Sequence, residues 1–356
     1  MLSPRVIDDR FATEVEVALA TVAGSDATAV EKTEMLVEIA MGLQKRPRAA
    51  AQIEGALVLY RKAVETCPAA EPLLRARTLA RMATALRTLP GDACAPLEAA
   101  LQALDDAAPA LAALGAAEEV AELEMNRGLV LQALAGAGRA RIQDAIAAYQ
   151  RAVRVFDRRR FPKEFAILHN NLATAFLAVA PGGERSKMSE ALAVSSFEEG
   201  LRGVNLIDHP VEYAMLQNNL GNALQSVTSA HTLDNSLRAL EAYDEALRVR
   251  TRGEMPTEYA NTIANRATCL WGLPDDPADP AAGNRENLRR ARRLLGEALE
   301  IFMEHGESVK AAAVREALEA IGAELAAADP ADIADPENPA DPENPADPAN
   351  IAEEPA

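Results

Sequence analysis

Two columns of side chains that recur along the chain constrain the fold more than any other feature. Helix-starting segments, in which proline is followed two residues later by glutamate, occur at Pro162, Pro210 and Pro256. Downstream of these and of related segments, a small residue is followed three residues later by a large apolar one. These pairs are Ala40 and Leu43, Ala83 and Leu86, Gly128 and Leu131, Ala173 and Phe176, Gly221 and Leu224, and Ala267 and Leu270. Each pair predicts a helix that a neighbouring helix can approach closely.

A second pattern lies between these helices and has a large side chain flanked by two small ones at helical spacing. Its members are Ala56/Tyr60/Ala63, Ala100/Leu104/Ala107, Ala145/Tyr149/Ala152, Ala193/Phe197/Gly200, Ala239/Tyr243/Ala246 and Ala291/Leu295/Ala298. The two patterns alternate and so predict six helical hairpins, each made of a helix A followed by a helix B. Strand-forming runs are scarce, and the aromatic content is only 4%, so a sheet-based core has little support.

The pattern resembles the tetratricopeptide repeat family, whose second helix carries alanine, an aromatic residue, alanine and a closing proline. Ala56, Tyr60, Ala63 and Pro68 match it, and the resemblance covers roughly residues 31–304. The chain departs from the family because it lacks the tryptophan column, has longer repeats, and places Arg127 and Arg266 where an apolar residue is expected. The resemblance implies an all-α fold, a right-handed α-solenoid of about six such hairpins with N- and C-terminal capping helices and a disordered tail.

Four segments are expected along the chain. They are an N-terminal helix or cap at residues 1–30, the repeat array at 31–308, a C-terminal capping helix at 309–328 and an acidic tail at 329–356. The tail has nine carboxylates and no basic residue. Its recurrent proline excludes regular helix and sheet ladders, and it has almost no apolar content to offset the entropy of ordering.

Charge and apolar content limit the possible partners. The formal net charge is −18, which disfavours binding to nucleic acid or to an anionic membrane. No apolar run approaches the ~20 residues needed to cross a bilayer, and residues 1–19 do not have the pattern of a signal peptide. Three cysteines without CxxC spacing indicate a reducing compartment. We therefore expect a cytoplasmic protein.

Catalytic and metal-binding patterns are absent from the sequence. The four histidines have no ligand spacing such as HExxH, and no glycine-rich phosphate loop occurs. Paired carboxylates lie in helical segments and are typical of solvated faces. Cys269, beside Trp271, is more typical of a packed small apolar residue than of a reactive thiol. We expect no enzymatic activity, no metal and no cofactor.

In the family that the chain resembles, A helices line a concave groove. Carried over to this sequence, the groove-facing residues are Arg77, Arg81, Asn170, Thr174, Asn218, Asn219, Asn222, Gln225, Asn261, Asn265 and Trp271. A carboxamide both donates and accepts hydrogen bonds, so this composition suits the main chain of an extended peptide. For Asn219 and Asn265 a role in packing within the repeat is an equal alternative, whereas Asn170, Asn218, Asn222 and Asn261 are the better candidates for contact.

Two functional hypotheses follow. The first is a scaffold or adaptor that binds an extended peptide or a partner surface in the concave groove. The alternative is an assembly chaperone or regulatory protein for a partner enzyme, in which the acidic tail modulates access to a groove that carries Arg77, Arg81 and Arg87. In both hypotheses the partner is a protein or peptide, and self-association through the terminal helices stays open.

Overall fold

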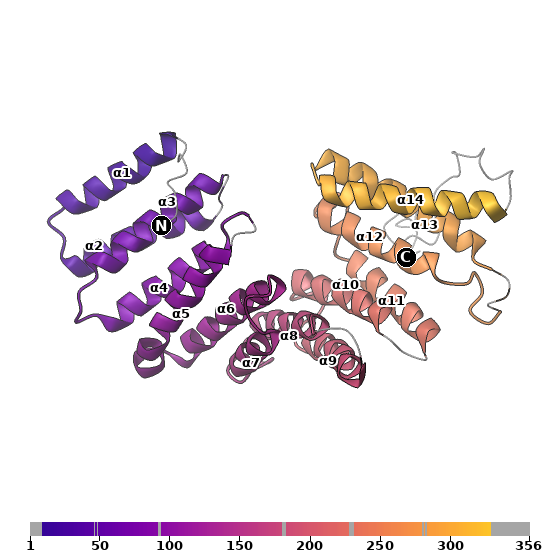
Figure 1. The fold of residues 1–356 in the computed structure, drawn as a ribbon, viewed down its shortest axis with the longest axis horizontal. Coiled ribbons are helices and arrows are strands. Elements are labelled where there is room, and N and C mark those ends of the chain that lie inside the picture. Colours follow the sequence, from indigo (N-terminus) through magenta and orange to yellow (C-terminus); the bar gives the residue numbers. More distant parts are fainter. Residues whose placement is uncertain are drawn as a thin grey trace, which may run out of the picture. The chain divides into compact units, whose positions relative to one another are not determined.

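A computed structural model describes residues 9–45, 47, 49–91, 94–179, 183–227, 231–279, 281 and 283–328. Across these ranges the chain forms fourteen α-helices and no strand (Figure 1). The all-α prediction is confirmed. The predicted disordered tail, residues 329–356, lies outside the described residues.

The helices alternate as the sequence predicts. Their bounds are α1 (Asp9–Gly24), α2 (Ala29–Lys45), α3 (Ala50–Thr66), α4 (Pro72–Arg87), α5 (Cys94–Leu114), α6 (Ala117–Gly136), α7 (Ile142–Val153), α8 (Pro162–Leu177), α9 (Gly183–Leu201), α10 (Pro210–Ser226), α11 (Thr232–Leu247), α12 (Pro256–Trp271), α13 (Arg285–Glu304) and α14 (Ser308–Ala328). The A helices are the even-numbered ones from α2 to α12, and each forms a hairpin with the B helix that follows it.

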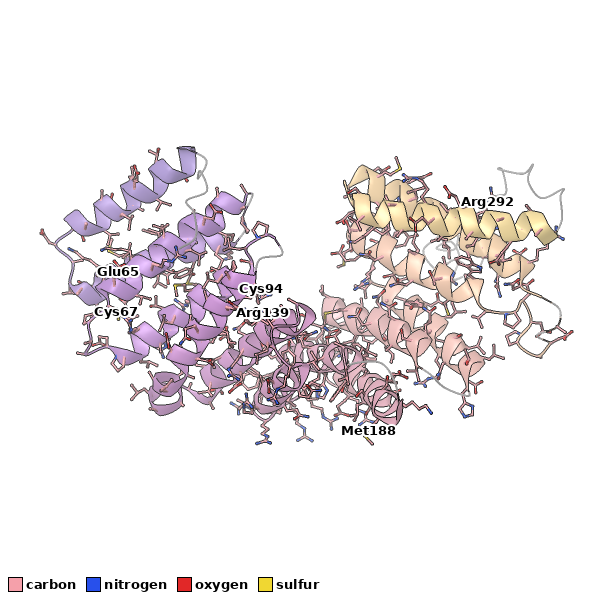
Figure 2. The ribbon with its side chains drawn as sticks, viewed as in Figure 1. Glu65, Cys67, Cys94, Arg139, Met188 and Arg292 are labelled. Carbon is pink, nitrogen blue, oxygen red and sulfur yellow. The ribbon has the colours of Figure 1, made fainter. Side chains whose placement is uncertain are left out.

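The chain divides into two compact units, residues 1–157 and residues 158–356, which we call unit 1 and unit 2. Unit 1 contains α1 to α7, drawn from indigo to magenta in Figure 1, and unit 2 contains α8 to α14. Within each unit every hairpin packs against the next one along the chain, with side chains filling the space between helices (Figure 2). The buried apolar side chains form one cluster in unit 1 and two in unit 2. This neighbour-to-neighbour stacking is the architecture of an α-solenoid and confirms the predicted fold class.

The small column on the A helices exists because the large side chains of the B helices press against it. Tyr60, Tyr149 and Tyr243 are fully buried. A Cβ atom built at Gly128 would lie 2.4 Å from Cε1 of Tyr149, and one at Gly221 would lie 2.6 Å from Cε1 of Tyr243. At these two positions the tyrosine ring contacts the backbone of helix A directly, so that only glycine fits.

Proline begins four of the A helices, the three predicted ones and α4, which begins at Pro72. Pro162, Pro210 and Pro256 are the first residues of α8, α10 and α12. Since the first helical N–H has no intrahelical acceptor, proline loses no hydrogen bond there, and its fixed φ already suits the helix. In α8, α10 and α12, glutamate in the first turn lies near the positive end of the helix dipole.

The two arginines that depart from the family pattern form ion pairs between neighbouring hairpins. Arg127 on α6 donates from Nε to Asp105 on α5 at 2.9 Å, and Arg266 on α12 donates from Nε to Asp244 on α11 at 2.7 Å. Each arginine thus joins an A helix to the B helix that precedes it. The carboxylate partner explains how a charged residue replaces an apolar one in this column.

The terminal helices cover the two ends of the array. Val15 and Val22 of α1 are buried, and α1 packs so closely on α3 that a Cβ at Gly55 would lie 2.9 Å from Val15 Cγ2. On α14, which packs on α13, Ile321 and Leu325 are buried in one apolar cluster with side chains of α12 and α13. The predicted capping helices are therefore present. Among the helices that the structure describes, none has the length and apolar content needed to cross a membrane.

Candidate functional site

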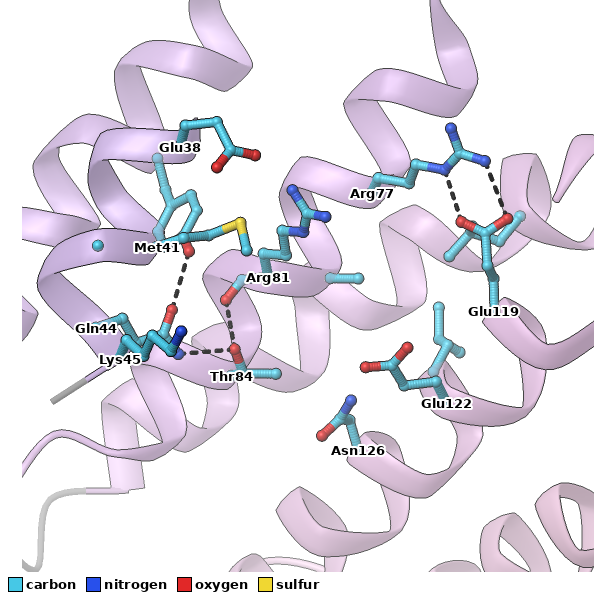
Figure 3. A pocket seen from close by; sticks show the side chains of 15 residues that line it. Glu38, Met41, Gln44, Lys45, Arg77, Arg81, Thr84, Glu119, Glu122 and Asn126 are labelled. Carbon is cyan, nitrogen blue, oxygen red and sulfur yellow. Dashed lines mark hydrogen bonds and ion pairs between the residues drawn. The ribbon is translucent and has the colours of Figure 1, made fainter. Parts of the chain in front are cut away.

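A hollow of about 960 Å³ in unit 1 is lined by three successive A helices, α2, α4 and α6 (Figure 3). We call the face that the A helices of a unit form the inner face of that unit. Its apolar lining comes mainly from Met41, Ala80, Leu111 and Leu123. Its charged lining comes from Glu38, Lys45, Arg77, Arg81, Glu119 and Glu122. Both predicted groove residues of unit 1, Arg77 and Arg81, therefore line the same hollow.

Arg77 is already paired. Its guanidinium donates two hydrogen bonds to the Glu119 carboxylate, at 2.6 and 3.1 Å, and so bridges α4 and α6. Glu119 also accepts the backbone N–H of Ala116 at 2.9 Å, at the start of α6. The hydrogen bonds from Arg77 first, and the one from Ala116 second, hold the pKa of Glu119 below its ordinary value. The ion pair therefore joins the two helices, and both of its side chains are already engaged within the chain.

A relay of hydrogen bonds fixes the backbone that carries Arg81. The Tyr60 hydroxyl donates to Gln44 Oε1 at 2.9 Å, Gln44 Nε2 donates to Thr84 Oγ1 at 2.9 Å, and Thr84 Oγ1 donates to the Arg81 carbonyl at 2.7 Å. Burial raises the pKa of Tyr60 to about 12, so the hydroxyl keeps its proton near neutral pH. The relay joins α2, α3 and α4 through side chains that line the hollow, and dashed lines mark its bonds in Figure 3.

Arg81 itself is exposed and its guanidinium forms no ion pair among the described residues. The same is true of the carboxylates of Glu38 and Glu122, which are also exposed. Figure 3 shows Arg81 on the middle helix, with Glu38 on α2 to one side and Glu122 on α6 to the other. Lys45 on α2 also lines the hollow, is exposed and forms no ion pair among the described residues, so the hollow offers four charged groups to a ligand, two from α2 and one each from α4 and α6.

The inner face of unit 2 carries amides that bond to one another. Asn265 on α12 donates to Asn218 on α10 at 3.2 Å, and Asn218 donates to Asn219 at 3.0 Å. Asn219 donates to Asn170 on α8 at 2.8 Å, and Asn170 donates to Asn171 at 3.3 Å. We call these five side chains the amide ladder. It crosses three A helices and joins four of the residues predicted to face a ligand.

The ladder uses only part of its hydrogen-bonding capacity. Each carboxamide has two N–H groups and two acceptor lone pairs, and the ladder engages about one of each. Asn171 and Asn218 are buried, and Nδ2 of Asn171 has no partner among the described residues. Asn170, Asn219 and Asn265 are half-buried and can present their remaining groups to a ligand.

Two further predicted residues of unit 2 hold a buried tyrosine. The Tyr243 hydroxyl donates to Asn222 Oδ1 at 2.7 Å and accepts from Gln225 Nε2 at 2.5 Å. In unit 1 glutamine is likewise the partner but accepts the bond: the Tyr149 hydroxyl donates to Gln132 Oε1 and the Tyr60 hydroxyl donates to Gln44 Oε1, both at 2.9 Å. Gln225 and Asn222 therefore have a structural partner inside their own hairpin.

The sequence contains a signal for these pairs that the sequence analysis missed. Glutamine follows the large residue of helix A in the three hairpins whose helix B carries tyrosine. In the other three hairpins, where helix B carries Leu104, Phe197 or Leu295, the residue at this position is Arg87, Leu177 or Trp271. Glutamine occupies this position only where a buried hydroxyl needs a partner, as the cost of an unsatisfied buried polar group requires.

The remaining predicted residues of unit 2 differ in their surroundings. The indole N–H of Trp271 donates to both carboxylate oxygens of Glu324 on α14 at 3.0 Å, so Trp271 ties the sixth hairpin to the closing helix. Thr174 Oγ1 donates to the Asn171 carbonyl at 3.0 Å. Asn261 is half-buried, and its side chain has no hydrogen bond among the described residues.

Cys269 is a packed residue, as expected. Cys269 is buried, and its Sγ donates a hydrogen bond to the Ser236 carbonyl oxygen at 3.3 Å. Burial raises the pKa of the thiol to about 12. A thiol in this state is not a nucleophile near neutral pH. Within the described parts of the chain, His, Cys, Asp and Glu side chains form no group that could hold a metal ion.

No protein-family model matches the chain, and no curated protein matches it. Among solved structures it is similar to one described as the crystal structure of a Rap protein complexed with competence and sporulation factor. The sequences are 13% identical, the TM-score is 0.43, and the match covers 91% of this chain and 89% of that chain.

Proposed function

We propose that the protein is an interaction scaffold or adaptor that binds an extended peptide, or a partner surface, along the inner faces of its A helices. The observation that carries this proposal is the hollow in unit 1. Three successive A helices contribute side chains to it, its lining combines apolar and charged groups, and four of its charged side chains form no ion pair among the described residues. Its volume of about 960 Å³ suits several peptide residues.

The amide ladder supports a similar role for unit 2. Its half-buried amides retain donors and acceptors that match the N–H and C=O groups of a peptide main chain. Because the amides are held by one another, little side-chain entropy would be lost when a ligand binds. Main-chain recognition of this kind gives affinity with little dependence on the peptide sequence.

Selection of peptides tests the proposal. Random-sequence peptides displayed on phage would be selected against the immobilised full chain and then measured against Arg81→Ala combined with Glu122→Ala. Selected peptides that occupy the hollow should bind this variant about tenfold more weakly, since two desolvated charge contacts are lost. Arg61→Ala is the matched control, because Arg61 is an exposed arginine on the B helix α3 and does not line the hollow.

Two results would count against a binding groove in unit 1. One is the absence of any selected peptide, and the other is a set of peptides whose affinity for the double variant equals that for the unmodified chain. Far-ultraviolet circular dichroism of each variant confirms that the helices persist. Because Arg81 and Glu122 are exposed, their removal should leave the fold intact.

The second candidate is a chaperone or regulator whose acidic tail modulates access to this hollow. The unpaired guanidinium of Arg81 favours it, since the tail carries nine carboxylates. The charges of Glu38 and Glu122 oppose it, because both carboxylates would repel an acidic segment. Deletion of residues 329–356 should raise peptide affinity at low salt and have little effect at high salt if the tail competes. Equal affinities with and without the tail would exclude this role.

A further inference from the structure

We propose that a cluster of arginines at the start of α13 is the docking surface for the chain's own acidic tail, residues 329–356. The arginine cluster consists of the basic side chains in the first nine residues of this helix, which are Arg285, Arg289, Arg290, Arg292 and Arg293. The inference does not rest on the proposed peptide-binding function. It depends on how charge is distributed along α13 and on where the tail leaves the fold.

The charges of α13 oppose the dipole of the helix itself. The amino-terminal end of a helix is positive and favours acidic groups, and the carboxyl-terminal end is negative and favours basic groups. In α13 the arginine cluster occupies the first half, whereas Glu297, Glu300 and Glu304 lie in the second half. Each half is therefore stabilised by opposite charge that comes from outside the helix.

A cation from a neighbouring loop supplies this charge to the acidic half. Arg252 lies between α11 and α12 and forms three ion pairs with α13. Its guanidinium nitrogens lie 3.7 Å from the carboxylates of Glu297 and Glu300 and 3.8 Å from that of Glu304. The arginine cluster calls for the same arrangement with the signs exchanged, which is an acidic segment.

The described residues around the arginine cluster leave positive charge available. Glu286 on α13 is shared between Arg289 at 3.5 Å and Arg290 at 3.8 Å, and both distances are longer than those of a direct charge-assisted hydrogen bond. Asp275 accepts two backbone N–H groups in the first turn of α13, at 2.9 and 2.7 Å. Arg292 is exposed and forms no ion pair among the described residues.

The tail leaves the fold beside this cluster. Only residues 305–307 join α13 to α14, so α14 runs back along α13, and Figure 1 shows the two helices side by side. Their lengths are nearly equal, 20 and 21 residues, so the end of α14 lies level with the start of α13. Leu325 near that end and Leu288 near that start belong to one apolar cluster. The first residue of the tail therefore follows directly at the level of the arginines.

The tail suits the arginine cluster in charge and in reach. It has nine carboxylates and no basic residue, and its first acidic residues are Asp329, Asp332 and Asp335. Since an extended chain spans at most about 3.6 Å per residue, Asp332 lies within roughly 14 Å of the end of α14. A segment attached so close has an effective concentration on the order of millimolar, which favours the tail over an acidic segment of another protein. The last turn of α14 has no basic residue that could hold the tail instead.

Binding of the tail as a separate peptide tests the inference. A fluorescent peptide of residues 329–356 is titrated at low ionic strength into the full chain and into a chain that ends at Ala328, and anisotropy measures its affinity. All helices that the structure describes precede residue 329, so the shortened chain keeps them. Because the attached tail competes for the same surface, the peptide should bind the shortened chain about three to ten times more tightly than the full chain. A matched peptide in which Asn replaces every Asp and Gln replaces every Glu should bind neither.

Substitutions in the shortened chain locate the contact. Arg289→Gln combined with Arg292→Gln should weaken peptide binding about three- to tenfold, since an exposed ion pair changes affinity by a factor of about 1.5 to 5. Arg61→Gln combined with Arg158→Gln removes the same charge at two exposed positions outside the cluster and should leave the affinity unchanged. Arg292→Gln alone keeps the test valid if circular dichroism shows that the double variant has lost helix content.

Three results would overturn the inference. They are no binding to the shortened chain, equal losses in the cluster variant and its control, and a loss confined to Arg81→Gln, which would place the tail in the hollow of unit 1. Equal affinity of the peptide for the full and the shortened chain would also overturn it. If the cluster variant weakened binding in that case, the arginine cluster would bind acidic segments of other proteins rather than this tail.

Discussion

The inner faces of the two units use the same backbone positions for different chemistry. The residue two positions before the small column is Glu38, Arg81 and Asn126 in unit 1, and Asn171, Asn219 and Asn265 in unit 2. In unit 1, Glu38 and Arg81 are exposed charges without ion-pair partners among the described residues. In unit 2 the equivalent amides belong to the ladder and bond to their neighbours. The position in the repeat decides which way a side chain faces. Its chemistry decides whether neighbouring side chains of the same protein bond to it.

The largest expected effect concerns the framework that both units share. Gly128→Ala in unit 1 and Gly221→Ala in unit 2 each place a methyl group within 2.4 to 2.6 Å of a buried tyrosine ring. Both should lower the free energy of unfolding by about 1–3 kcal/mol, as overpacking of a core does. Urea denaturation followed by circular dichroism measures the change.

A helical glycine with open space around it provides the control. Gly296 lies within α13, and a Cβ there would meet nothing within 4 Å. Gly296→Ala should raise stability by up to about 1 kcal/mol, because alanine is the better helix former. If Gly221→Ala were as stable as Gly296→Ala, the tight contact of ring and backbone would be refuted.

The next effect should separate the two inner faces. Asn218→Ala removes one donor and one acceptor from the amide ladder and leaves Asn219 and Asn265 without these partners, so unfolding should become easier by about 1–2 kcal/mol. Arg81→Ala removes an exposed side chain without an ion pair and should change stability by less than about 0.5 kcal/mol. Thermal denaturation of both variants compares them, and equal losses would contradict the distinction between the faces.

Acidification should change the stability contributed by two carboxylates, one in each unit, in opposite directions. The pKa of Glu119 in unit 1 is lowered by its bond to Arg77, so the stability that this pair contributes is present above the ordinary value of 4.5 and is lost as pH falls through the folded pKa. In unit 2, burial raises the pKa of Glu297, so its contribution is present below 4.5 and is lost as pH rises through the folded pKa. Between about pH 6 and 3, Glu119→Gln should therefore flatten the loss of stability on acidification, while Glu297→Gln should steepen it.

The pH experiment requires urea denaturation at several pH values for the unmodified chain and both variants. The expected change in the free energy of unfolding is small for Glu119, since the Arg77 side chain is about half exposed and solvent screens the pair. The sign is the informative result. If both variants changed the pH dependence of the free energy of unfolding in the same direction, the opposite pKa shifts of Glu119 and Glu297 would be contradicted.

The smallest effect is kinetic and compares local opening of the units. Cys94 is half-buried, whereas Cys67 in unit 1 and Cys269 in unit 2 are buried. Cys94 should react first with a thiol reagent, and the other two should react only when their own unit opens. Mass spectrometry of labelled peptides gives the three rates. Labelling of Cys269 as fast as that of Cys94 would contradict its packed environment.

The fold could be read from the sequence because its signals are local. Packing pairs such as Gly221 with Tyr243, and helix-starting prolines such as Pro210, recur along the chain. Each hairpin needs only its neighbours to bury its apolar side. The candidate site could be located but not described. Arg77 lines the hollow, but its bond to Glu119 depends on how far apart α4 and α6 lie, which no spacing in the sequence records.

Contacts between side chains of different hairpins were the part that escaped prediction. Asn219 and Asn170 are far apart in the sequence and meet only because two A helices stack in one register. The pairing of Gln225 with Tyr243 was readable from the sequence, since glutamine accompanies tyrosine in three hairpins and neither residue type occupies these positions in the other three. The assignment of groove residues to a ligand, and the four predicted segment boundaries, stay predictions.

The glutamine and tyrosine pairs have a consequence for how such a chain can change. Each pair lies inside one hairpin, so a copy of that hairpin inserted elsewhere would bring both partners with it. The ion pairs of Arg127 and Arg266 join one hairpin to the one before it and would be broken by the same insertion. The glutamine and tyrosine pairs therefore allow a hairpin to be duplicated without loss of a contact. The arginine ion pairs instead favour the existing order of the hairpins.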